Sequence, residues 1–107
     1  MSLLNNLMGP DLEQGLKEYE AVPGAILLDV RTPEEFASGH IPGAVNLPNE
    51  DIGTEEIPSL PDKDKLILVY CRSGNRSKQA AQKLVNLGYT NIVEFGGIMD
   101  WKGEIKK

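Results

Sequence analysis

The residues best suited to chemistry form one short segment, residues 71–77, which reads Cys-Arg-Ser-Gly-Asn-Arg-Ser. Gly74 permits a backbone turn that other residues resist, and the helical pattern that begins at Arg76 offers unpaired amide donors and a positive dipole end at its start. A helix start and neighbouring arginines lower a thiol pKa from about 8.5 to as little as about 3.5–7.5. We therefore expect Cys71 to be largely thiolate, the nucleophile that sulfur transfer or ester cleavage needs. The alternative is that Cys71 is simply a small buried residue at a strand end, as most free cysteines are.

Composition narrows the functions that such a site can serve. With one Cys and one His, the chain can form neither an internal disulfide nor a zinc site of three or four Cys and His ligands. We expect no metal and no other cofactor. A net charge of −5 argues against nucleic acid as a partner, because phosphate binding needs a basic face. Arg72, Arg76 and Lys78 nevertheless surround Cys71 with positive charge, and that local excess suits a small anion.

The length of 107 residues is that of one domain. We predict that residues 1–107 form a single unit in which residues 1–10 are disordered or partly vector-derived. No apolar run approaches the roughly 20 residues needed to cross a bilayer, and the N-terminus lacks the basic start of a secretory signal. We expect a cytoplasmic monomer or homodimer that binds neither nucleic acid nor membranes.

Hydrophobic patterns predict strands and helices that alternate along the chain. Continuous apolar runs at residues 25–30 and 65–70 are typical of strands covered on both faces, and residues 44–47 and 91–95 predict shorter strands. Helical spacing of apolar residues predicts helices over residues 11–20 and from Arg76 to the glycine at position 88. The pattern predicts an α/β fold with three layers, in which a central parallel sheet of four to five short strands carries helices on both faces.

Local signals add two shorter elements. Thr32, Pro33 and Glu35 have the order of an N-cap, a first-turn proline and the third residue of a capping box, which predicts a short helix. Thr54 predicts a helical turn over residues 54–60. The first of these elements follows the strand at residues 25–30 directly.

Asp29 and Arg31 stand at the carboxyl end of that strand. In a parallel sheet, ligands bind outside the carboxyl ends of the strands, so these two residues share an edge with the Cys71 loop. They are candidates for supporting the loop. We expect their main role to be a structural ion pair or a cap on the following turn, and Glu35 to act through its cap alone.

Three motifs in this order resemble the rhodanese homology domain. They are residues 28–31 (Leu-Asp-Val-Arg) continuing through residues 39–46 (Gly-His-Ile-Pro-Gly-Ala-Val-Asn), the loop at residues 71–77, and Gly96-Gly97 followed by Trp101. The resemblance extends from about Ala25 to Lys102 and identifies the chain as a single-domain rhodanese-like sulfurtransferase. We expect Gly96, Gly97 and Trp101 to pack under the active-site loop.

The resemblance also implies a reaction and its residues. Cys71 would take the sulfane sulfur of a small anionic donor, such as thiosulfate or a polysulfide, and become a persulfide. A thiophilic acceptor, namely cyanide, a small thiol or a protein cysteine, would then remove that sulfur. Arg72 and Arg76 would bind the donor, and the loop would stabilise the persulfide; the substrate-binding residues implied are Arg72, Ser73, Gly74, Asn75, Arg76 and Ser77.

Two other functions compete with this one. The domain could be a sulfur carrier or partner-binding module that turns over small donors poorly. A cysteine-dependent phosphatase is the other alternative, but such enzymes place five residues between cysteine and arginine. Here four residues separate Cys71 from Arg76, so we expect the loop to be too tight for phosphate and suited to a single sulfur atom.

Overall fold

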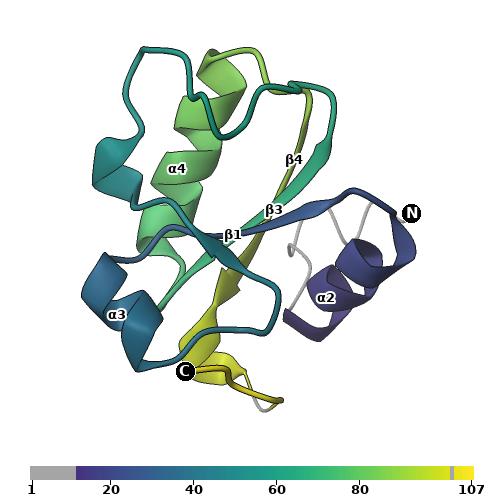
Figure 1. The fold of residues 1–107 in the computed structure, drawn as a ribbon, viewed down its shortest axis with the longest axis vertical. Coiled ribbons are helices and arrows are strands. Elements are labelled where there is room, and N and C mark those ends of the chain that lie inside the picture. Colours follow the sequence, from purple (N-terminus) through teal and green to yellow (C-terminus); the bar gives the residue numbers. More distant parts are fainter. Residues whose placement is uncertain (1–11, 102) are drawn as a thin grey trace.

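A four-stranded parallel sheet forms the centre of the computed structural model, which describes residues 12–101 and 103–107 (Figure 1). Its strands are β1 (Ile26–Asp29), β2 (Val45–Asn46), β3 (Leu66–Cys71) and β4 (Asn91–Gly97), in the order β2-β1-β3-β4. The predicted parallel sheet of short strands is therefore confirmed. The prediction for residues 1–10 lies outside the described residues.

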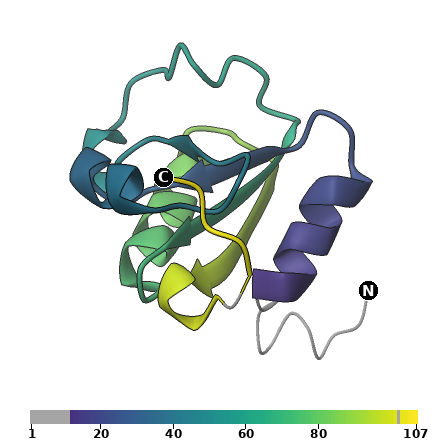
Figure 2. The ribbon, with the colours of Figure 1, turned by 60° about the horizontal axis from the view of Figure 1, so that its bottom comes forward.

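Helices cover both faces of this sheet, which confirms the three layers. Helix α2 (Leu12–Ala21) lies on one face and α4 (Asn75–Asn86) on the other (Figures 1 and 2). Successive side chains of a strand point to opposite faces, so each strand contributes to two apolar clusters. The cluster under α2 contains Leu27, Ile41, Leu68, Tyr70 and Phe95, and the cluster under α4 contains Leu28, Val30, Ile67, Val69, Ala80 and Leu84 among its members.

The capping box starts helix α3 (Pro33–Ser38) as predicted. The Glu35 amide donates to Thr32 Oγ1 at 3.2 Å, and the Thr32 amide donates to Glu35 Oε1 at 3.0 Å. Two otherwise unpaired amides are thereby satisfied in a helix of six residues, which is too short to be stable on propensity alone. The box also fixes the position of the Glu35 carboxylate.

A buried ion pair ties the end of β1 to the turn after α3. Arg31 Nη2 lies 2.7 Å from Asp29 Oδ2, and Arg31 Nε donates to the same carboxylate. Nη2 also donates to the Gly39 carbonyl at 2.7 Å. Two buried charges satisfied in this way fix a polar turn inside the domain. The structural ion pair expected from the sequence is present.

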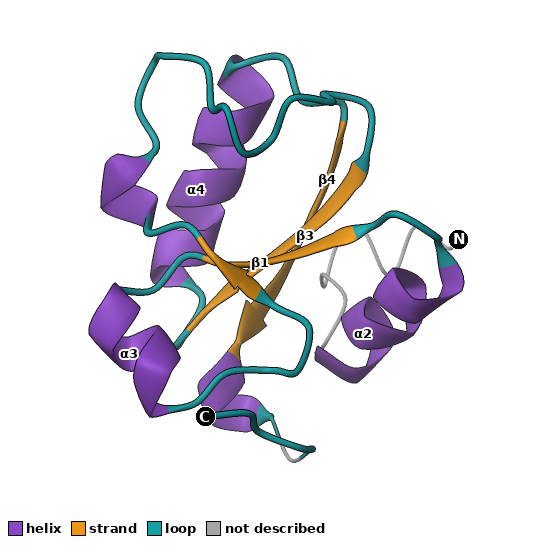
Figure 3. Cartoon of the chain, in the orientation of Figure 1, coloured by secondary structure: helices purple, strands orange, loops and turns teal. Residues whose placement is uncertain are grey.

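Three local predictions need correction. Residues 54–60 form bends and a turn instead of a helical turn, and a 3-10 helix lies upstream at Asn49–Asp51. Burial of Ile52 and Leu60 against the α4 cluster anchors this segment, whereas Pro58 cannot donate a helical hydrogen bond. Helix α4 begins one residue early, at Asn75, and β4 extends to Gly97 (Figure 3). None of the described helices has the length and apolar character needed to span a membrane.

Candidate active site

Cys71 is the last residue of β3, and residues 72–74 connect it to α4 across the carboxyl edge of the sheet (Figure 3). Only 1% of Cys71 is exposed. Gly74 has a φ of 109°, a left-handed conformation that glycine adopts without strain, and its amide donates to Cys71 Sγ at 3.0 Å. Ser77 Oγ, in the first turn of α4, lies 3.5 Å from the same sulfur. The Gly74 amide and the Ser77 hydroxyl therefore lie against the thiol, and anion binding by this loop stays a prediction.

These contacts shift the acidity of the thiol. Burial raises the pKa of Cys71, but hydrogen bonds from Ser77 and from the backbone amides of Ser77, Gly74 and Ser73 lower it by more, so the pKa lies below its ordinary value. A negative sulfur surrounded by fixed donors loses less by leaving water than one in an apolar cavity. The loop therefore favours an anionic sulfur on Cys71.

The end of β4 presses against the backbone of this loop. A Cβ added to Gly97 would lie 2.1 Å from the Arg72 carbonyl oxygen and 2.7 Å from Ser73 Cα. The Met99 amide donates to the same Arg72 oxygen at 3.1 Å. The close approach predicted for the glycine pair is thus found at Gly97, and it holds the loop in place.

The predicted position of Trp101 under the loop is wrong. Its side chain packs against the cluster under α2, and its Nε1 donates to the Glu104 carbonyl at 2.9 Å. The short 3-10 helix Ile98–Asp100 that follows β4 carries the chain to the opposite face from Cys71. Trp101 therefore stabilises the C-terminal segment and has no contact with the thiol among the described interactions.

Arg76 is bound by Glu35, a residue that was expected to act only in the capping box. Arg76 Nη1 lies 2.7 Å from Glu35 Oε1, and Nη2 donates to Oε2 at 3.0 Å. The bond from Arg76, together with the bonds from Thr32, holds the pKa of Glu35 at about 2 against the opposing effect of burial. This two-pronged pair joins α3 to the start of α4 and compensates the charge of Arg76.

A second carboxylate lies behind the loop. Ser77 Oγ is 2.5 Å from Glu94 Oε2, and the Gly96 amide donates to that oxygen at 3.0 Å. Glu94 comes from β4, so three elements contribute to this hydrogen-bonded group. Glu94 was not predicted as a site residue; a carboxylate between the apolar residues Val93 and Phe95 was the signal available.

The predicted loop residues differ in their surroundings. Arg72, Ser73 and Asn75 are exposed, Arg76 is half-buried, and Gly74 and Ser77 are buried. No hydrogen bond among the described residues joins Asp29 or Arg31 to residues 71–77, although the charge of Asp29 contributes to the raised pKa of Arg76. Within the described chain, no group of three His, Cys, Asp or Glu side chains could bind a metal ion.

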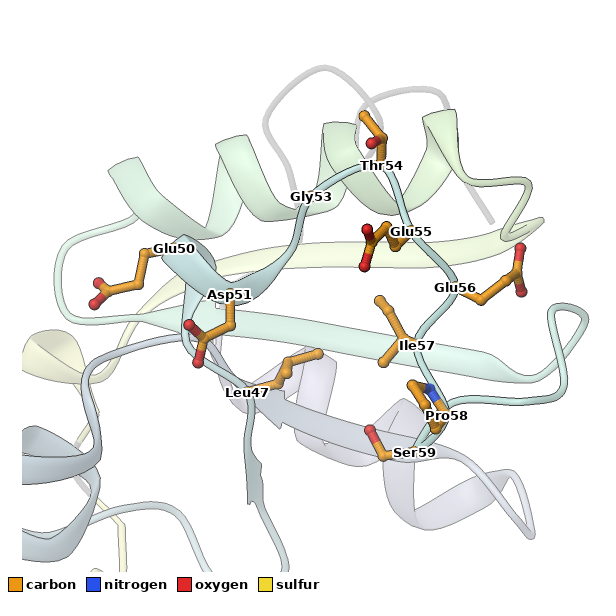
Figure 4. A pocket seen from close by; sticks show the side chains of 10 residues that line it. All are labelled: Leu47, Glu50, Asp51, Gly53, Thr54, Glu55, Glu56, Ile57, Pro58 and Ser59. Atoms are coloured by element: carbon orange, nitrogen blue, oxygen red, sulfur yellow. The ribbon is translucent and has the colours of Figure 1, made fainter.

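A separate hollow of about 630 Å³ lies beside residues 50–59 (Figure 4). Four carboxylate side chains line it, and Leu47 and Ile57 form part of its apolar wall; the acidic residues are Glu50, Asp51, Glu55 and Glu56. No residue of the Cys71 loop lines this hollow. Its negative charge is also unsuited to an anionic ligand.

Known proteins share this sequence and fold. The family model described as rhodanese-like domain matches residues 10–104. A protein named sulfurtransferase from Allochromatium vinosum is 40% identical over 102 residues, covering 92% of this chain and 89% of its own. Thiosulfate sulfurtransferase GlpE of Pseudomonas syringae is 38% identical over 94 residues, with 87% and 83% covered. A solved structure titled as a rhodanese with anions from E. coli is 36% identical, covers 78% of this chain and 99% of its own, and has a TM-score of 0.68.

Replacement of Gly97 by alanine tests the contact that holds the loop. We expect Gly97→Ala to push the Arg72–Ser73 backbone away, to misdirect the amides that face Cys71 Sγ, and to slow alkylation of Cys71 by iodoacetamide at pH 7 about ten-fold, equivalent to a rise of about one pKa unit. Gly53→Ala is the matched control, because nothing lies within 4 Å of the Cβ it would add. Equal alkylation rates in the two folded variants would contradict this role of Gly97.

The ion pair between Glu35 and Arg76 predicts an acid-dependent loss of stability. The pKa of Glu35 is lowered from 4.5 to about 2 in the folded protein, so its contribution is complete above about pH 4.5 and is lost as the pH falls toward 2. We expect the unfolding free energy of Glu35→Gln, measured by urea denaturation between pH 2.5 and 7, to depend less on pH than that of the unsubstituted protein. The exposed-site variant Glu34→Gln serves as the control, and parallel curves for Glu35→Gln and the unsubstituted protein would refute the prediction.

Proposed function

The chain belongs to the rhodanese-like domain family, and we propose that it is a sulfurtransferase in which Cys71 carries the sulfur as a persulfide. The observation that carries this proposal is the set of donors around Cys71 Sγ, above all the Gly74 amide at 3.0 Å. Such donors suit a sulfur that is anionic both as thiolate and as persulfide. Relatives named sulfurtransferase and thiosulfate sulfurtransferase support the same reaction class.

The proposed reaction has two displacements. The Cys71 thiolate attacks the outer, sulfane sulfur of the donor, forming a new S–S bond while the donor's own bond to that sulfur breaks. The donor leaves as sulfite when it is thiosulfate, or as a shortened chain when it is a polysulfide. An acceptor (cyanide, a small thiol or a protein cysteine) then attacks the outer sulfur of the Cys71 persulfide, and the bonding electrons return to Cys71 as thiolate.

Arg72 is the better placed of the two arginines to attract an anionic donor. It is exposed, and none of the salt bridges found among the described side chains includes it, whereas Arg76 is paired with Glu35. A guanidinium already compensated by a carboxylate attracts a second anion less strongly. We therefore assign donor attraction mainly to Arg72 and assign to Arg76 the task of holding the start of α4.

The same contacts disfavour a phosphatase. With Gly74 N already 3.0 Å from Cys71 Sγ, the loop closes on the sulfur itself, and the arginine that would clamp a phosphate is engaged with Glu35. The second alternative is a carrier that delivers sulfur to one protein partner, which would use the same Cys71 persulfide. Comparison of thiosulfate turnover with transfer to a protein thiol separates the carrier from the enzyme.

We also propose a cytoplasmic location, because a single reactive thiol suits a reducing compartment.

Replacement of the nucleophile tests the persulfide directly. After incubation with thiosulfate or polysulfide, we expect the intact mass of the protein to rise by one sulfur atom and to return on addition of cyanide. Since Cys71 is the only cysteine, Cys71→Ser should abolish both the adduct and sulfur transfer while leaving the circular dichroism spectrum unchanged. Sulfur transfer retained by Cys71→Ser would refute the mechanism.

A comparison of two variants tests whether Arg72 contributes more than Arg76 to donor binding. We expect Arg72→Ala to raise the KM for thiosulfate about ten-fold, or about 1.4 kcal/mol, and Arg76→Ala to raise it less. An uncharged organic trisulfide is the control donor, for which Arg72→Ala should have little effect. If Arg76→Ala raised the KM for thiosulfate as much as Arg72→Ala does, the ion pair with Glu35 would not prevent Arg76 from binding the donor.

A further inference from the structure

Cys71, Ser77 and Glu94 form a continuous chain of hydrogen bonds. Cys71 Sγ lies 3.5 Å from Ser77 Oγ, and Ser77 Oγ lies 2.5 Å from Glu94 Oε2. The three residues come from β3, α4 and β4, so only the folded domain brings them together. The carboxylate also accepts a bond from the Gly96 amide, which fixes the oxygen that faces Ser77.

The Ser77 hydroxyl has a single hydrogen to donate. Three acceptors lie within reach of it: Glu94 Oε2 at 2.5 Å, the Gly74 carbonyl at 3.0 Å and the Gly96 carbonyl at 3.4 Å. The bond to the carboxylate is the shortest and is charge-assisted, so it takes the hydrogen. In that state Ser77 Oγ accepts the bond from the neutral Cys71 thiol. Ser77 can donate to a Cys71 thiolate, and so lower the pKa of Cys71, only after it gives up its bond to Glu94.

We propose that Glu94 is a positioning residue that controls the ionisation of Cys71 through Ser77. When the thiolate forms, the S–H proton of Cys71 passes to Ser77 Oγ, and the original Ser77 proton passes to Glu94 Oε2. Ser77 then donates to the thiolate, and one negative charge has moved from Glu94 to Cys71. The inference rests on the proposed role of Cys71 as nucleophile, and the acceptor step that restores the thiolate allows the proton to return by the same route.

Burial explains why such a route is needed. Cys71 is 1% exposed and Ser77 is not exposed at all, whereas Glu94 is only partly buried. The backbone amides around Cys71 Sγ donate hydrogen bonds and cannot accept its proton. Ser77 and Glu94 therefore provide a hydrogen-bonded path from the buried sulfur to a carboxylate that reaches solvent.

Other charged groups near the site are unchanged by this step. The side chains concerned come from the loop, α3, α4 and the end of β1: Arg72, Glu35, Arg76, Lys78, Asp29 and Arg31. The cations favour the Cys71 thiolate, and Glu35 and Asp29 are each paired with an arginine. A difference between variants that alter only Glu94 therefore isolates the effect of that carboxylate.

The test is the pH dependence of Cys71 alkylation by iodoacetamide, which reports thiolate and needs no sulfur donor. We expect Glu94→Gln to lower the midpoint of this titration by about one pH unit, because it removes a neighbouring negative charge and frees the Ser77 hydrogen for the thiolate. Glu20→Gln, which removes an exposed carboxylate from α2, should leave the midpoint unchanged. An unchanged or raised midpoint in folded Glu94→Gln overturns the proposal.

A double-mutant cycle tests whether the effect passes through Ser77. In a Ser77→Ala background, we expect Glu94→Gln to shift the midpoint by less than half as much as in the unsubstituted protein. An equal shift in both backgrounds would mean that Glu94 acts on Cys71 directly through space, and it would overturn the proposed route. Because the titration is independent of sulfur transfer, failure of this proposal is distinguishable from failure of the proposed function.

Discussion

The close approach of Gly97 to the backbone of Arg72 and Ser73 constrains the whole functional edge of this domain. Cys71 ends the central strand β3. Without a contact from another element, the loop that follows Cys71 would not be held in one conformation. Gly97 supplies that contact because it has no side chain, and the bond from the Met99 amide to the Arg72 carbonyl fixes the distance. The Gly74 amide can then point at Cys71 Sγ, and α4 can begin where Ser77 meets the same sulfur.

Charge at this edge is organised by two carboxylates with different tasks. Glu35 completes the cap of α3 and also binds Arg76, so one side chain connects two helices and compensates the charge of Arg76. Glu94 binds the Ser77 hydroxyl behind the sulfur. An acidic domain thereby carries an exposed guanidinium, that of Arg72, next to Cys71 in the chain and a carboxylate, that of Glu94, behind the loop.

The sequence allowed prediction of the elements and of the loop, because both depend on residues close together in the chain. The capping box spans Thr32 to Glu35, and the anion cradle lies within residues 71–77. The partners of that cradle could not be predicted in this way. Arg76 meets a carboxylate 41 positions away and Ser77 one 17 positions away, and no spacing rule links them. Trp101 was misplaced for a related reason: the 3-10 turn after β4, which takes it to the other face of the sheet, has no strong sequence signal.

The Ser77 hydroxyl has one hydrogen to donate, and this limits how well Cys71 and Glu94 can both be stabilised as anions. A thiolate on Cys71 and a carboxylate on Glu94 would compete for the single hydrogen of Ser77. Backbone amides also donate to both groups: the Gly74 amide, with those of Ser73 and Ser77, to the sulfur, and the Gly96 amide to the carboxylate. The Glu94 carboxylate, by holding the Ser77 hydrogen, therefore raises the free-energy cost of forming the Cys71 thiolate. A persulfide changes that balance, because its outer sulfur lies one S–S bond, about 2 Å, beyond Cys71 Sγ and carries the charge away from Ser77. In the proposed persulfide state, the Ser77 hydrogen could therefore return to Glu94 while the sulfur stays anionic.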